Sequence, residues 1–301
     1  MNNLMNTRQP AYSGFTLVEL IIVIVITGIL VAVVGPLIAG RYQAIVDTQQ
    51  RASWVQQAET ALFHIQQDLG RSVPNSVRTS EAVSGNDKVV EFFTLSPEQT
   101  TPVLRYRDRN YQPNFDRLNI NNDNSFDVFG ELSDLPTNTS TYVAIATPGF
   151  TQLYSAWTNE LSGDEEGYIA EIVSVSNRTS CDCGDCSLCP VAQVTLDNSS
   201  HRFPNNSPFY RVYFTNGPVA YRCANERLAR ISGYTALGNG TLASRIGSAM
   251  PNWVVDDVIS CNFAWTPGFL YRPPTLTVTL SLGNGDEGIQ LTDTFVLRNS
   301  L

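Results

Sequence analysis

Lysine and histidine are scarce in this sequence of 301 residues. Lys88 is the only lysine, and His64 and His201 are the only histidines. Because Lys88 follows an aspartate, the sequence lacks the Gly-Lys pair of a phosphate-binding loop. It also lacks the His-Glu-x-x-His pattern of zinc proteases and the Gly-x-Ser-x-Gly pattern of serine hydrolases. We therefore expect no enzymatic activity, no catalytic residue and no cofactor.

Basic residues are also fewer than acidic ones. The chain has 19 basic and 28 acidic residues, so its net charge is −9. An acidic surface repels phosphate backbones, which makes nucleic acid an improbable partner. Hydrophobic residues make up 43% of the chain, enough for a packed core. The length allows one ordinary domain with additional segments.

Charged residues are missing altogether between Leu20 and Ala39. An apolar stretch of about 20 residues is long enough to cross a bilayer as a helix. A secretory signal has a shorter apolar region and a small-residue cleavage site after it. Here the small residues Ser13 and Gly14 come before the apolar run. A simple membrane anchor would not explain Glu19, because a carboxylate inside an apolar span is costly.

The run Gly14-Phe15-Thr16-Leu17-Val18-Glu19-Leu20 resembles the N-terminal signal of type IV prepilins and pseudopilins. The resemblance extends over about 30 residues and includes Pro36. It implies that a prepilin peptidase cuts after Gly14 and methylates the new N-terminus, Phe15. The predicted organisation is therefore a leader over 1–14, a transmembrane segment over 15–39, an amphipathic helix over 40–73 and a β-rich head over 74–301.

The same resemblance implies the location and the partners. The chain would cross the inner membrane once, with a cytoplasmic N-terminus and a periplasmic head, before it enters a pilus or pseudopilus. Its expected partners are the prepilin peptidase, other major and minor pilins through the N-terminal helix, the inner-membrane assembly platform and the lipid bilayer.

Three residues of the N-terminal segment are assembly candidates: Phe15, Glu19 and Pro36. Cleavage would leave a positive amine on Phe15, and Glu19 lies one helical turn further on. We hypothesise that the carboxylate of one subunit neutralises the amine of its neighbour. Glu19→Val should then leave cleavage and insertion intact but abolish incorporation into filaments. Pro36 either forms a tolerated kink or marks a segment that unwinds on extraction from the bilayer.

A helical pattern continues beyond the apolar run. Apolar residues recur every three, four or seven positions, which predicts one apolar stripe on a helix from Phe15 to Val73. The stripe consists of Ile45, Ala52, Val55, Ala58, Leu62, Ile65 and Leu69. Pro74 should end the helix. The resemblance to pilins implies that the distal half of this helix packs on a β-sheet.

Short runs rich in β-branched and aromatic residues follow, bounded by Gly, Pro, Asn and Asp. Helix first and strands afterwards indicate an α+β fold with an antiparallel sheet. The polar stretch from Arg107 to Ser140 should be a surface loop, and residues 283–288 a hairpin turn. The expected strands are Val89–Leu95, Tyr142–Thr147, Tyr168–Val175, Val191–Leu196, Tyr210–Thr215, Ala220–Cys223, Arg227–Tyr234, Val258–Trp265, Leu276–Leu282 and Ile289–Leu297.

Six cysteines lie in the second half of the chain. Four of them, Cys181, Cys183, Cys186 and Cys189, fall within nine residues and could bind metal or form two disulfides. A head outside the cytoplasm favours disulfides, with the pairing left open. Cys223 and Cys261 remain as a further candidate pair.

A second polar pattern has oxygen-bearing side chains at alternate positions. Asn119, Asn121, Asp123 and Asp127 are spaced like ligands in a calcium loop. The EF-hand pattern is not met, because Asn124 occupies the position of its glycine. A solvated polar loop is the preferred interpretation, and a calcium site is the alternative.

The chain is similar, within the pilin-like class, to MshO-type minor pilins of the MSHA (mannose-sensitive haemagglutinin) pilus system. The similarity rests on the anchor, the run 47–76, and the C-terminal run from Cys261 to Gly268 with the strands after it. The J-type minor pseudopilins of type II secretion share the same features. The expected function is a minor pilin that primes pilus assembly. The alternatives are a secretion pseudopilin and an adhesive or binding subunit at the tip.

Overall fold

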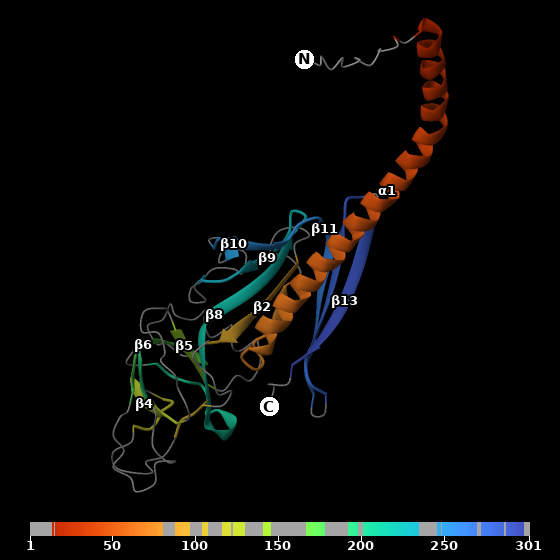
Figure 1. Cartoon of the computed structure of the whole chain (residues 1–301). Coiled ribbons are helices and arrows are strands. Elements are labelled where there is room, and N and C mark those ends of the chain that lie inside the picture. Colours follow the sequence, from red (N-terminus) through yellow and green to blue (C-terminus); the bar gives the residue numbers. More distant parts are fainter. Residues whose placement is uncertain are drawn as a thin grey trace, which may run out of the picture. The chain divides into compact units, whose positions relative to one another are not determined.

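The computed structural model describes residues 14, 16–80, 88–96, 104–107, 116–121, 123–129, 141–145, 167–177, 192–197, 201–234, 246–247, 249–269, 272–285 and 287–297. The chain divides into two compact units, Met1–Ser53 and Trp54–Leu301. The architecture is α+β, as predicted: a long N-terminal helix and a head built of antiparallel strands (Figure 1).

Helix α1 runs from Leu17 to Gly70 and is continuous through Pro36. It ends three residues before the predicted end at Val73. The amides of Arg71 and Ser72 bond to the carbonyls of Asp68 and Leu69, at 3.1 and 3.0 Å. These bonds reach back only three residues, so the last turn is tightened and the helix stops at a glycine.

The last turns of α1 belong to the second unit and form the centre of one of its cores. Within the predicted stripe, Ala58, Leu62, Ile65 and Leu69 are buried there. The stripe does not continue into the first unit, where Ile45 and Ala52 are exposed. The prediction missed another set of buried side chains, namely Trp54 and Ala61. The buried face begins at Trp54.

Two antiparallel sheets make up the second unit. The larger has the order β1-β2-β8-β5-β6-β7-β4, with β3 and β9 also pairing with β8 and β10 pairing with β9. The smaller has the order β11-β12-β13. The strands are β1 (Arg78–Ser80), β2 (Lys88–Leu95), β3 (Leu104–Arg105), β4 (Ser125–Val128), β5 (Thr141–Ile145), β6 (Ile169–Asn177), β7 (Ala192–Leu196), β8 (Arg211–Ala224), β9 (Arg227–Ile231), β10 (Pro251–Val255), β11 (Val258–Thr266), β12 (Thr275–Gly283) and β13 (Gly288–Val296).

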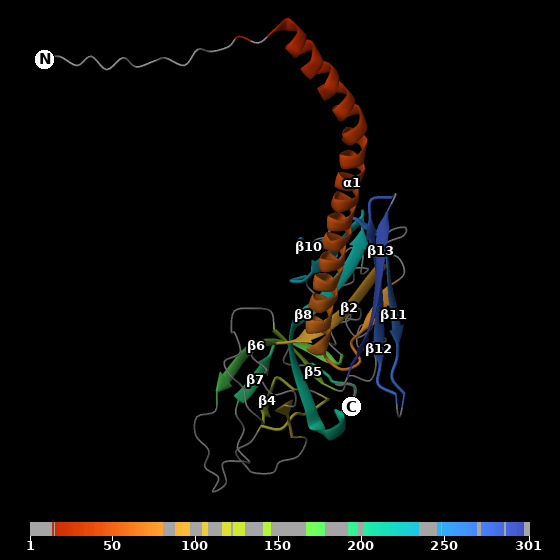
Figure 2. The same cartoon turned by 45° about the vertical axis from the view of Figure 1, so that its right-hand side comes forward.

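The C-terminal part of α1 packs against both sheets, as Figure 2 shows. Its buried face shares one hydrophobic cluster with Phe92 of β2 and Tyr221 of β8 in the larger sheet. The same cluster contains Leu280 of β12 and Phe295 of β13 in the smaller sheet. A helix with an apolar face is thereby covered from two directions. A second cluster lies around β5, β6 and the first half of β8.

Strand β8 corrects one prediction, because the expected strands Tyr210–Thr215 and Ala220–Cys223 are a single strand of 14 residues. The sequence Asn-Gly-Pro between them predicts a turn, but Gly217 has φ +103° and the register against β2 shifts there. The Thr215 hydroxyl accepts a bond from the Gly217 amide at 3.2 Å. The glycine therefore forms a β-bulge that bends the strand without ending it.

The stretch predicted as a surface loop from Arg107 to Ser140 is also wrong in part. It contains β4, which pairs with β7, and Phe126, Asp127 and Val128 are fully buried. Ser125 to Val128 alternate between polar and apolar side chains, but they lie in a stretch rich in Asn and Asp, which favoured the loop prediction. Strands β1, β3 and β10 were also missed.

Candidate functional site

The N-terminal candidates lie where α1 begins. The amide of Glu19 donates a hydrogen bond to the Thr16 hydroxyl at 3.3 Å. The first helical bond follows, from the Leu20 amide to the Thr16 carbonyl at 3.2 Å. Thr16 is therefore the N-cap of the helix, and Glu19 occupies the position of the acidic residue in a capping box. This spacing of Thr and Glu was visible in the sequence, but its capping role was overlooked.

Gly14 lies just before this cap and is exposed. Phe15, between Gly14 and Thr16, lies outside the described residues. Glu19 is also exposed, one turn into the helix. A carboxylate in the first turn of a helix is favoured by the helix dipole, but its apolar neighbours offer it no counter-charge.

The first half of α1 has a continuous apolar surface. The large hydrophobic side chains described from Leu17 to Val46 are each at least 42% exposed. α1 is long and apolar enough to cross a membrane. Pro36 lies within this surface and has no amide hydrogen, so the carbonyl of Ala32 lacks its usual helical donor. The predicted role of Pro36 in unwinding stays a prediction.

In the second unit, Asp68 attaches α1 to the larger sheet. Its carboxylate accepts bonds from the Tyr221 hydroxyl at 2.7 Å and from the Arg230 guanidinium at 2.6 Å. Burial raises the pKa of Tyr221 well above its usual range, and the hydrogen bond to Asp68 is the second-largest cause. Burial works against the charge of Arg230, but the Asp68 carboxylate outweighs it and raises the pKa of Arg230. Both hydrogen-bond donors therefore keep their protons at physiological pH.

The predicted pair Cys223 and Cys261 forms a disulfide. Cys223 lies on β8 of the larger sheet and Cys261 on β11 of the smaller one. The bond therefore fastens the two sheets that enclose the C-terminal part of α1. The other four cysteines, Cys181, Cys183, Cys186 and Cys189, lie outside the described residues.

Side chains proposed as calcium ligands accept hydrogen bonds from backbone amides. The Asp123 carboxylate accepts the amides of Asn119 at 2.6 Å and Ser125 at 3.2 Å. Desolvation raises the pKa of Asp123. Asp127 is fully buried and accepts the Asp116 amide at 2.9 Å, and Asn121 donates its amide to the side chain of Asn119 at 3.3 Å. Across the described residues, no three His, Cys, Asp or Glu side chains are grouped to hold a metal. Calcium binding stays a hypothesis.

The two histidines differ in burial. His64 is exposed on α1. His201 is 4% exposed, and its Nε2 lies 3.0 Å from the Gly167 carbonyl oxygen. Its ring packs edge-on against Phe203, with 4.6 Å between ring centroids. His201 is thus a buried structural residue.

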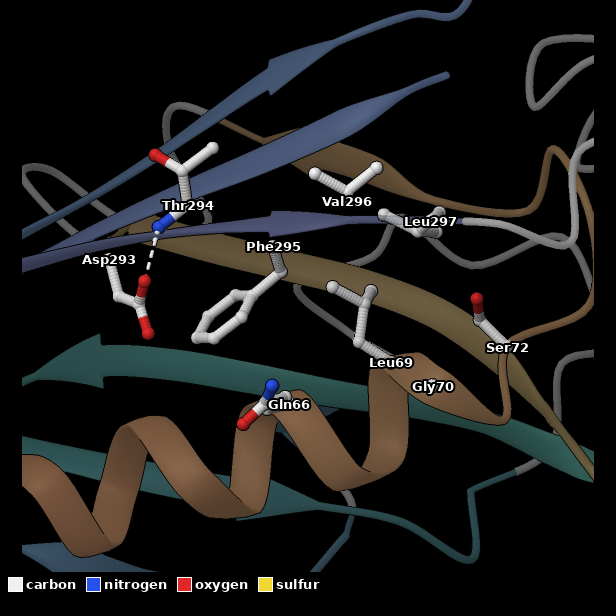
Figure 3. A pocket seen from close by; sticks show the side chains of 9 residues that line it. All are labelled: Gln66, Leu69, Gly70, Ser72, Asp293, Thr294, Phe295, Val296 and Leu297. Carbon is white, nitrogen blue, oxygen red and sulfur yellow. Dashed lines mark hydrogen bonds between the residues drawn. The ribbon is translucent and has the colours of Figure 1, made fainter.

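A cavity of about 420 Å³ lies between the end of α1 and the last strand (Figure 3). It is lined by Gln66, Leu69, Gly70, Ser72 and residues 293–297. Asp293 is the ionisable group of this lining, and it accepts the Thr294 amide at 2.7 Å. A lone carboxylate bonded to the amide of the next residue gives the cavity no acid–base pair for catalysis.

Comparison with known proteins agrees with the N-terminal geometry. Residues 10–35 match the family model described as the prokaryotic N-terminal methylation motif. No curated protein and no solved structure matches the chain. The matched segment covers Gly14, the Thr16 cap, Glu19 and the first half of the exposed apolar surface.

The motif indicates a type IV pilin-like protein. The motif implies a substrate of prepilin peptidase in a pilin assembly system, and the apolar helix that follows fits a membrane-anchored protein.

Proposed function

We propose that the protein is a minor pilin of the MSHA type, which takes part in priming pilus assembly. The observation that carries the proposal is the N-terminal methylation motif, which leads into an apolar, exposed helical surface. Such a surface is stable in two surroundings, the bilayer and the interior of a helical filament. A subunit that moves from one to the other keeps the same side chains covered.

Glu19 gives the proposal a mechanism. In the bilayer its carboxylate is costly, whereas a neighbouring subunit could supply the methylated amine of Phe15 as a counter-charge. The Thr16 cap fixes the first turn of the helix and therefore the place of this carboxylate. The charge would favour entry into the filament and would set the register between neighbours. Catalysis has no part in this function.

The build of the head supports a minor subunit over a major one. It contains two sheets and a disulfide between them, around the end of α1. A head of this size is large for the repeating unit of a filament. A subunit present in few copies does not have to pack against itself along the whole filament.

The test is to delete the gene in its host and to count surface pili by electron microscopy. Loss of pili, restored by the parent gene, supports a priming subunit. Normal pili would contradict it and would favour a secretion pseudopilin.

A second set of strains tests the mechanism. Complementation with Glu19→Val should restore processed protein in the membrane but not pili. Glu59→Val is the matched control, because Glu59 is exposed on the same helix beyond the apolar segment. It should restore both. Pili in the Glu19→Val strain would contradict the proposed role of this charge.

A further inference from the structure

Arginine and aromatic side chains gather at one place on the larger sheet of this acidic protein. Strand β3 places Arg105 directly opposite Arg211 of β8. On its other side, Arg105 forms a bridge with Phe129. Opposite residues of antiparallel strands project to the same face. Phe129, Arg105 and Arg211 therefore form a row, which together with Arg107 and Phe209 is called here the Arg–aromatic patch.

Both ends of the row carry a cation next to an aromatic ring. The guanidinium carbon of Arg107 lies 5.2 Å from the ring centroid of Phe129. The guanidinium carbon of Arg211 lies 5.4 Å from the ring centroid of Phe209. These contacts restrict the guanidinium groups, and a restricted guanidinium loses little freedom when it binds a carboxylate.

The centre of the row lacks counter-charges in the described part of the chain. Like charges directly opposite each other destabilise a sheet. Arg78, Arg227 and Arg230 each pair with a carboxylate. Among the described residues, no such pair involves Arg105, which is exposed, or Arg211, which is half-buried. Moreover, the Arg211 Nε is buried without a hydrogen-bond acceptor there. An anionic ligand between the two guanidinium groups would relieve the repulsion between them.

The segment just before β8 exposes the aromatic ring of Phe209 to solvent. Phe209 and Tyr210 have φ of +61° and +58°, which is unfavourable for bulky residues, and Phe209 is 70% exposed. Buried Tyr106 holds this turn. Its hydroxyl accepts the Ser207 amide at 2.8 Å, and its amide donates to the Tyr210 carbonyl at 2.9 Å. Strain that is maintained by surrounding bonds is a mark of functional sites.

We propose that the Arg–aromatic patch binds a short glycan that carries a carboxylate, such as a uronic acid. The carboxylate would pair with Arg105 and Arg211, since guanidinium groups suit carboxylates geometrically. The apolar face of the sugar ring would stack on Phe209, as aromatic rings favour such contacts. The net charge of −9 disfavours a long, densely charged polyanion. This inference does not depend on the proposed role in assembly.

The test is isothermal titration calorimetry. Trigalacturonate is titrated into the full mature protein in detergent micelles. Maltotriose, a neutral glycan, measures the contribution of the carboxylates. Triglutamate and vesicles containing phosphatidylglycerol test whether an acidic peptide or a lipid headgroup binds instead. Binding should weaken as sodium chloride is raised, because the contact is ionic.

Three variants locate the binding. The double variant Arg105→Gln/Arg211→Gln should lose about tenfold or more in affinity, as expected for bonds to charged groups. Phe209→Gly should lose about two- to tenfold while its melting temperature stays at or above that of the parent, because glycine adopts positive φ without strain. Arg272→Gln removes an exposed arginine elsewhere and should bind like the parent.

Binding of trigalacturonate that is lost in the double variant and kept in Arg272→Gln supports the proposal. Absence of binding to the parent protein would overturn it, and so would equal binding by all variants. Preferential binding of triglutamate or of the vesicles would overturn it in favour of a protein or lipid surface.

Discussion

The disulfide between Cys223 and Cys261 should supply a large part of the stability of the second unit. Its two cysteines are 38 residues apart in the sequence, with Cα atoms 6.4 Å apart. For a loop of this length, the loss of chain entropy in the unfolded state corresponds to about 4 kcal/mol at 25 °C. The double variant Cys223→Ala/Cys261→Ala should therefore be less stable than the parent by about 3–4 kcal/mol.

The variant should nevertheless fold. The side chains that cover the buried face of α1 come from both sheets, and removal of the disulfide leaves them in place. In a unit of this size, a loss of about 4 kcal/mol lowers the melting temperature by about 8–16 °C. The loss should appear as a lower unfolding midpoint with unchanged secondary structure.

Thermal unfolding of the full protein in detergent, followed by near-ultraviolet circular dichroism, measures this change. The substitution is preferable to a reducing agent, because a reducing agent is not specific for this disulfide. Ser260→Ala, a neighbouring exposed position on β11, is the control and should unfold like the parent. A change of less than about 1 kcal/mol in the double variant would refute the entropy argument.

Three other predictions concern single side chains. Thr16→Val removes the N-cap, which costs about 1 kcal/mol, so the Glu19 amide should exchange about fivefold faster by NMR. Ile65→Ala should lower the free energy of unfolding by about 2–5 kcal/mol in chemical denaturation, whereas the exposed Phe63→Ala should change it by less than about 0.5 kcal/mol. Because the pKa of Tyr221 is raised in the folded state, its contribution is present below pH 10 and is lost as the pH rises above it. Tyr221→Phe should therefore lose less stability than the parent between pH 9 and pH 11 in equilibrium unfolding; equal losses would contradict this.

The anchor could be predicted from the sequence because its signal is local. Continuous apolarity predicts the helix, and the family motif occupies consecutive residues that end before Pro36. Long strands could also be predicted from the sequence, since β2, β12 and β13 show runs of β-forming residues bounded by turn residues. The hairpin at residues 283–288 is confirmed by the pairing of Gly283 with Gly288.

Elements that depend on tertiary contacts were not predictable in this way. Asn-Gly-Pro in β8 looks like a turn, and only the pairing with β2 shows that Gly217 forms a bulge. Strand β4 has polar residues on both sides and is recognisable only by its pairing with β7. Trp54 was missed because the buried face of α1 depends on where the sheets cover it.

The candidate sites show the same difference between local sequence signals and tertiary contacts. Gly14 and Glu19 belong to one short motif, so the resemblance to prepilins covered both residues. Asp68 gave no signal, since its partners Tyr221 and Arg230 lie more than 150 residues away in the sequence. Likewise, Arg105 and Arg211 become neighbours only through the pairing of β3 with β8.

The most direct test of the account is the mass of the N-terminal peptide of the protein purified from the membranes of its host. The account predicts a peptide that begins at Phe15 and carries one methyl group on its amine. A chain that still begins at Met1 would contradict it, and so would cleavage after the apolar segment.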